Sequence, residues 1–199
     1  MIWLIAAVVI GDQDVAKQLK DVADRMHDTV IEVRTSASAG GVQAPTFGAG
    51  VLIGGGLALT TLHTVSGGSD VEVLVQGSGA VAAKVVGGFP EIDIALLRLA
   101  DADGLPSAPL ADRSPAIGDA LIAIGADDEA VSAVGVSVAA VNGDLLVLAS
   151  NRRVDSRFWG GPIFDTQRRL VAIDLAALAL PGAITASSLR TLLQQASAK

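Results

Sequence analysis

Apolar and polar residues follow a helical period near the start of the chain. Between Asp12 and Met26 the apolar residues recur at helical spacing, and acidic and basic residues lie between them. The apolar positions are Val15, Leu19, Val22, Ala23 and Met26. This spacing is typical of an amphipathic α-helix that buries one face. We therefore predict a helix within residues 12–28.

Beyond residue 28 the period changes to short apolar runs separated by glycines, which is typical of strands. In the first half, the strand-like positions are Val30, Val33, Val51, Ile53, Leu57, Leu59, Val71, Val73, Val75, Val81, Val85 and Leu97. In the second half, the corresponding runs cover residues 121–124, 131–141, 145–149, 163–165 and 170–175. The pattern indicates an all-β body.

Residues 101–117 divide this body into two halves. They combine Asp, Gly and Pro with little periodicity, as expected of a connector on the surface. Several short strands in each half fit two packed antiparallel β-barrels better than one open sheet. We predict barrel one at about residues 29–100, barrel two at about 118–186 and a short C-terminal helix at 187–196, all within one domain spanning 29–199.

Composition and charge exclude several classes of protein. With 199 residues, 51% hydrophobic and 18% charged, the chain can bury a sizeable core and is not disordered. The net charge is −7 and the basic residues are scattered, so we expect no nucleic-acid partner. The chain has no cysteine and only two histidines, His27 and His63, which disfavours a metal site built by the protein.

A cluster of glycines at residues 48–56 superficially fits a phosphate-binding loop. Such loops lead into a helix whose N-terminus faces the phosphate. Here the glycines bracket the apolar run Val51–Ile53, which is a predicted strand. We therefore expect neither a nucleotide nor any other small-molecule cofactor.

The first residues leave two interpretations open. Residues 1–10 are apolar, but they are too short to cross a bilayer and lack the basic start of a secretory signal. Residues 1–11 are either a weak or truncated export signal or a strand or tail that docks on the body. The first interpretation favours a periplasmic or secreted protein, whereas the second leaves a cytoplasmic location open. Any membrane contact is expected through residues 1–10 alone.

Two titratable residues are distinguished by their position. His63 lies in the run Leu59–Val65, after the glycine cluster, and Asp93 opens the apolar run Ile94–Leu97. Taken singly, each fits a purely structural role. They are followed by Gly160–Pro162, and this order of His, Asp and Gly-Gly-Pro resembles the trypsin-like serine proteases, most closely their bacterial HtrA-like branch.

The resemblance runs from about Val30 to Leu193. It is carried by Gly48–Ile53, Leu59–Val65, Asp93–Leu97, Gly104–Pro106, Gly118–Gly125, Val171–Asp174 and Ala183–Thr185. It implies the double-barrel fold that the strand pattern also predicts. HtrA-like proteases carry a C-terminal PDZ domain, but this sequence ends at Lys199, shortly after the last predicted helix, so we expect no such domain in it.

The resemblance also implies roles for individual residues. His63 corresponds to the general base, and Asp93 to the acid that orients it. Where the family has Gly-Asn-Ser before Gly-Gly-Pro, this sequence has Arg157, Phe158 and Trp159. An indole has no group that attacks a carbonyl. The N–H groups of Arg157 and Trp159 stand at the oxyanion-hole positions, and a Cβ at residue 157 would displace that peptide if the family's glycine needs a special conformation.

The size of the expected loss in turnover favours an inactive homologue. Loss of the serine from such a triad lowers turnover on the order of a millionfold. We therefore predict a catalytically inactive relative that acts as a peptide- or protein-binding or regulatory module. The alternative is an active HtrA-like endopeptidase with an unrecognised nucleophile such as Ser156, three residues before Trp159. A structural domain with a filled cleft is a third interpretation.

Four further positions are implied by the resemblance. Arg153 stands where related proteases place the base of the S1 pocket, although an exposed charge cluster with Arg152, Asp155 and Arg157 is the favoured explanation. Asp174, Leu175 and Ala176 match the strand that pairs with substrate backbone, so an extended peptide or protein segment is the expected partner. The alternative is an ordinary strand whose groove is covered by Trp159.

Overall fold

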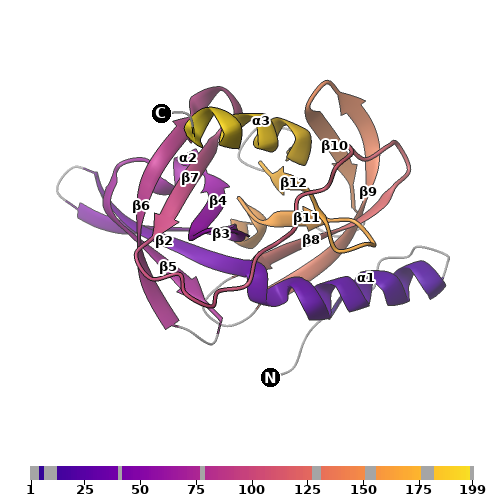
Figure 1. Ribbon diagram of the computed structural model, residues 1–199, viewed down its shortest axis with the longest axis horizontal. Coiled ribbons are helices and arrows are strands. Elements are labelled where there is room, and N and C mark those ends of the chain that lie inside the picture. The colour runs from indigo at the N-terminus through magenta and orange to yellow at the C-terminus, as the bar shows by residue number, and fades with distance from the viewer. Residues whose placement is uncertain are drawn as a thin grey trace.

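The computed structural model describes residues 5–6, 13–39, 42–76, 79–126, 131–150, 156–175 and 182–197. Strands dominate these segments, and they form two groups that lie side by side. Helix α1 runs along one of the two groups, and helix α3 crosses the opposite side of the molecule (Figure 1).

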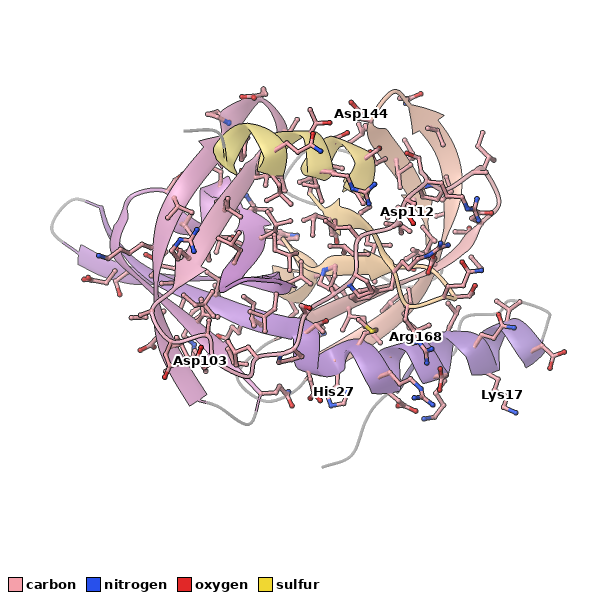
Figure 2. The ribbon with its side chains drawn as sticks, viewed as in Figure 1. Lys17, His27, Asp103, Asp112, Asp144 and Arg168 are labelled. Atoms are coloured by element: carbon pink, nitrogen blue, oxygen red, sulfur yellow. The ribbon has the colours of Figure 1, made fainter. Side chains whose placement is uncertain are left out.

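Helix α1 spans Gln13–Met26, as the helical period predicts. Its apolar face, including Leu19 and Val22, is buried in the main core. The opposite face is charged, and Lys17 points into solvent there (Figure 2). On this face an Arg25 hydrogen bond lowers the pKa of Asp21, and Arg168 reaches the same carboxylate from barrel two at 3.5 Å.

Barrel one is a closed antiparallel barrel with the strand order β2-β3-β4-β7-β6-β5. Its strands are β2 Val30–Ala39, β3 Val42–Gly54, β4 Leu57–Thr61, β5 Gly68–Val75, β6 Gly79–Phe89 and β7 Ile94–Leu99. Alternate strand positions point inward, so Ile31, Val33, Val73 and Leu97 fill the interior and are fully buried.

Barrel two has the strand order β9-β10-β13-β12-β11-β8, and pairing between β8 and β9 closes it. Its strands are β8 Ala120–Ala126, β9 Val131–Asn142, β10 Leu145–Ala149, β11 Pro162–Phe164, β12 Leu170–Asp174 and β13 Gly182–Thr185. Helix α3, Ala186–Ser197, follows β13 directly and packs on β12 and β13. The prediction of two packed antiparallel barrels with a helix near each end is therefore confirmed.

The N-terminal segment enters the structure as a short strand. Strand β1, Ile5–Ala6, pairs in parallel with β9 at Ala133 and Val134. For these two residues the structure shows the docked strand, which is the second of the two interpretations of this segment. No helix among the described segments combines the length and apolar character needed to span a membrane.

A shared apolar core joins the barrels and places the functional groups. Val51, Leu59 and Ile94 of barrel one pack in the same buried cluster as Ile124 and Ile173 of barrel two. Side chains in such a core are held at near-crystalline density. Loops that end at this interface are therefore fixed relative to each other, although they come from different barrels.

Candidate functional site

His63 lies on a single helical turn next to the barrel interface. Strand β4 ends at Thr61 in an extended conformation, and the chain turns directly into α2, Leu62–Val65. The hydroxyls of Thr61 and Thr64 lie 2.7 Å apart, and both residues are fully buried. Because buried hydroxyls are costly unless paired, this hydrogen bond fixes the turn that carries His63.

Asp93 forms three hydrogen bonds with the turn that carries His63. Its backbone adopts a left-handed conformation, φ 53° and ψ 39°, which aspartate tolerates better than most residues. The carbonyl of Asp93 accepts a hydrogen bond from Leu62 N at 2.9 Å. Its Oδ1 accepts from the backbone N–H of His63 at 2.9 Å, and its Oδ2 lies 2.6 Å from His63 Nδ1.

These contacts determine the tautomer of His63. An ionised carboxylate can only accept hydrogen bonds, so the proton of the neutral imidazole lies on Nδ1 and the lone pair lies on Nε2. The prediction of a retained base and orienting acid concerns this pair, and the structure brings the two residues into direct contact. Nε2 of His63 is itself inaccessible and has no hydrogen-bond partner.

Trp159 follows a 3-10 turn, η3 Ser156–Phe158, and its backbone is bound to both barrels. Its carbonyl accepts a hydrogen bond from Ala49 N of β3 at 2.7 Å. The next residue, Gly160, donates to the carbonyl of Asp174 in β12 at 2.9 Å. The peptide that carries Trp159 is therefore held in place at the barrel interface.

The indole of Trp159 packs edge-on against the imidazole of His63. The ring centroids are 5.7 Å apart and the planes are inclined by 69°. Such T-shaped pairs are a favoured aromatic arrangement. The structure thus places an aromatic ring against His63, at the position where the family resemblance implies a hydroxyl.

The two residues before Trp159 differ in burial. Arg157 is exposed, and its φ is not in the left-handed region, which among described non-glycine residues is occupied by Asp93 and Arg168 alone. It lies within the 3-10 turn η3.

Phe158 is a structural residue that the sequence analysis missed. Its side chain is 2% exposed and packs in the core of barrel two. It anchors the loop from inside, while Arg157 and Trp159 on either side are more exposed. The available signal was weak, namely one of four phenylalanines beside the substituted position.

The strand expected to pair with a peptide is partly occupied. Asp174 N donates to the carbonyl of Gly161 at 3.0 Å, and its own carbonyl accepts from Gly160. Leu175 N donates to the carbonyl of Gly182 at 2.8 Å. The N–H groups of Asp174 and Leu175 are therefore not available to pair with a peptide.

Some predicted positions fall outside the description. Ala176, Arg153 and the side chain of Ser156 lie outside the described residues, so the predicted S1 base and the alternative nucleophile remain predictions. Within the described part of the chain, no group of three or more His, Asp or Glu side chains is placed to hold a metal ion.

Comparison with known proteins places this geometry in context. Residues 48–173 match the family described as Trypsin-like peptidase domain. The chain is also similar in fold to the crystal structure of the serine endoprotease from Yersinia pestis, with a TM-score of 0.75 and 22% identity. That match covers 89% of this chain and 66% of the Yersinia chain.

Two relatives have contrasting descriptions. The chain is 33% identical over 96 residues to Serine protease Do-like HtrA of Lactococcus lactis subsp. lactis, which covers 46% of this chain and 24% of the relative. It is 29% identical over 174 residues to Probable membrane transporter protein MamO of Paramagnetospirillum magneticum, which covers 80% of this chain and 27% of the relative. The matched parts thus span about a quarter of these relatives.

Proposed function

We propose that this chain, which belongs to the family of trypsin-like peptidase domains, binds an extended peptide or protein segment at the barrel interface without cleaving it. Its resemblance to HtrA-type serine proteases supports a peptide as the ligand class. Binding without cleavage would make it a regulatory or scaffolding module of a protease-like fold.

The observation that carries this proposal is the position of Trp159 against His63. A serine-protease mechanism needs a hydroxyl within hydrogen-bond reach of Nε2, so that the imidazole can take its proton. Here an indole ring packs against the imidazole instead, with ring centroids 5.7 Å apart. Without the serine, turnover falls on the order of a millionfold.

The backbone around Trp159 supports a ligand-binding role rather than loss of the site. The hydrogen bonds from Ala49 N to Trp159 and from Gly160 N to Asp174 keep the loop in place between the barrels. The contact of His63 with Asp93 is also retained at 2.6 Å. A barrel interface that keeps these contacts can hold a segment even where the reaction is lost.

The alternative of an active endopeptidase rests on the same retained pair, His63 and Asp93. It requires a second hydroxyl, such as that of Ser156, to approach Nε2. The third interpretation, a purely structural domain, needs no ligand. The names of the two relatives do not favour either alternative, because one is described as a protease and the other as a transporter.

Cleavage of casein and labelling by a fluorophosphonate test the absence of activity. We expect the native chain to show neither. A double variant, Trp159→Ser with Arg157→Gly, provides the comparison, and we expect it to be labelled when His63 is present and not when His63→Ala is added. The proposal fails if the native chain cleaves casein and loses that activity on His63→Ala.

Binding is tested separately with a fluorescent pool of casein-derived peptides. We expect saturable binding to the native chain, measured by fluorescence anisotropy, and competition by unlabelled peptides from the same pool. Absence of binding up to the solubility limit of the pool would instead support the purely structural interpretation. An inert chain that binds peptides fits the proposed module alone.

We further propose export from the cytoplasm, on the basis of the apolar segment 1–11. The opposing observation is the docking of Ile5 and Ala6 on β9. Expression of the full chain with a C-terminal tag, followed by cell fractionation and mass determination of the N-terminus, separates the two. Loss of the segment together with an extracytoplasmic location supports export, and an intact cytoplasmic chain contradicts it.

A further inference from the structure

The reactive nitrogen of His63 is buried without a hydrogen bond. Nε2 has no partner and is inaccessible, although the side chain as a whole is 32% exposed. Asp93 binds the other ring nitrogen, so in the neutral imidazole the proton lies on Nδ1 and Nε2 carries the lone pair. A buried acceptor without a donor is unfavourable compared with the same acceptor hydrogen-bonded to water or a ligand.

The ring packed against this imidazole has no hydrogen bond of its own. Trp159 is partly exposed, and no described residue forms a hydrogen bond with its indole N–H. Its backbone, by contrast, is bound to Ala49, and Gly160 is bound to Asp174. These backbone hydrogen bonds do not depend on the two side-chain torsions of Trp159, so a different rotamer of the indole leaves them intact.

We infer that Trp159 is a displaceable cover, and that beneath it His63 Nε2 is the hydrogen-bond acceptor that anchors a donor of the bound segment. The donor is a hydroxyl or N–H group of the extended peptide, so the inference rests on the proposed function for its ligand. In the closed state the indole packs on the imidazole. In the open state the indole leaves it, and Nε2 accepts the donor.

Two opposing contacts make this a two-state element. The aromatic contact favours the closed state, whereas the unpaired Nε2 disfavours it. A ligand that binds only the open state pays for opening through reduced apparent affinity, in proportion to the open fraction. The cover therefore selects segments that supply a donor at Nε2 over segments that offer only apolar contacts.

Reaction with diethyl pyrocarbonate measures the cover without any peptide. The lone pair of an accessible imidazole nitrogen attacks the carbonyl of the reagent, a nitrogen–carbon bond forms, and ethyl carbonate leaves. The chain has two histidines, so His27 serves as an internal reference. His27 lies directly after the end of α1 (Figure 2), where its ring contacts Asp24 and Asp28.

We expect Trp159→Ala to raise the carbethoxylation rate of His63 relative to His27 by about tenfold or more, because the open state becomes permanent. Trp159→Phe keeps a smaller ring and should give an intermediate rate. Both rates are read from peptide masses in the folded chain, as checked by circular dichroism. An unchanged ratio between native and Trp159→Ala chains would overturn the cover.

Fluorescence of a Trp3→Phe chain tests displacement with the ring intact, since Trp159 is then the single tryptophan. We expect peptides from the casein pool to increase quenching of Trp159 by acrylamide, because the displaced indole enters solvent. Decreased quenching would mean that the ring closes over the peptide, and would overturn displacement. This measurement keeps the inference testable if Trp159→Ala fails to fold.

The outcomes separate this inference from the proposed function. If no peptide binds but Trp159→Ala accelerates the reaction of His63, the cover stands and the peptide ligand is wrong. If peptides bind while the reaction ratio stays unchanged, the binding module stands and the cover is wrong.

Discussion

Asp93 binds His63 twice, once through the backbone and once through the ring. Oδ1 accepts the backbone N–H of His63 at 2.9 Å, and Oδ2 lies 2.6 Å from Nδ1. The first N–H groups of any helix lack partners within that helix. Asp93 therefore caps the start of α2 as well as orienting the imidazole. This capping gives Asp93 a structural role that does not depend on catalysis.

This double role predicts that Asp93→Ala destabilises the protein more than His63→Ala. Asp93→Ala removes both hydrogen bonds to a charged acceptor, at a cost of about 2–4 kcal/mol. His63→Ala loses only the ring contact and keeps the backbone N–H bonded, at a cost of about 1–2 kcal/mol. Urea unfolding of both variants measures the difference. Equal costs would show that the backbone contact contributes nothing.

The burial of Phe158 predicts that its side chain stabilises the loop that carries Trp159. The ring is 2% exposed in barrel two, so Phe158→Ala should lower the free energy of unfolding by about 3–5 kcal/mol. Phe47, which is 48% exposed, provides a matched control, and Phe47→Ala should cost less than about 1 kcal/mol. Thermal unfolding of the two variants gives the comparison.

The same burial affects any attempt to restore the family's Gly-Asn-Ser segment. Phe158→Asn would place an amide in an apolar core, where an unpaired polar group is costly. We expect the triple variant Arg157→Gly, Phe158→Asn, Trp159→Ser to be less stable than the double variant that keeps Phe158. A triple variant as stable as the double one would mean that the loop has moved and left the core.

The fold and the segments that carry His63 and Asp93 could be predicted because their signals are periodic or local. The spacing of Leu19, Val22 and Met26 carries the helical period of α1. His63 follows the short apolar strand β4, and Asp93 precedes the short apolar strand β7. Each lies in a recognisable segment. Their contact follows from the closed barrel, since β4 and β7 are neighbours and Thr61 pairs with Ile94.

Other features depend on contacts that no local pattern encodes. Phe158 lies in a 3-10 turn too short to show a period, so its burial depends on the packing of barrel two. The backbone hydrogen bonds of Asp174 are formed with Gly160 and Gly161, which lie on a different segment of barrel two. The burial of His63 Nε2 likewise depends on side-chain packing at the barrel interface.

The contact between the hydroxyls of Thr61 and Thr64 predicts that substitutions at these two residues are energetically coupled. They form a hydrogen bond of 2.7 Å, and both residues are fully buried. Either single change to valine leaves the other hydroxyl buried without this partner, at a cost of about 1–3 kcal/mol. The double variant Thr61→Val, Thr64→Val should cost less than the sum, and a double-mutant cycle in urea measures this. Additive costs would contradict the coupling.

A comparison of Gly160 with Gly143 separates the energetic cost of backbone strain from that of steric crowding. Both have a positive φ, 79° and 62°, so alanine at either position is strained by about 1–2 kcal/mol. A Cβ on Gly143 would meet nothing within 4 Å, whereas a Cβ on Gly160 would lie 2.5 Å from the carbonyl oxygen of Ala49.

We therefore expect Gly160→Ala to cost about 2–5 kcal/mol in unfolding free energy, because overpacking adds to the strain. Gly143→Ala should cost only the strain, and urea unfolding of the two variants gives the difference. The extra cost arises where β3 meets the loop that carries Trp159, so Gly160→Ala should also change the fluorescence of Trp159 in a Trp3→Phe chain, while Gly143→Ala should not. Equal costs with unchanged fluorescence would mean that the loop is free to move away from β3.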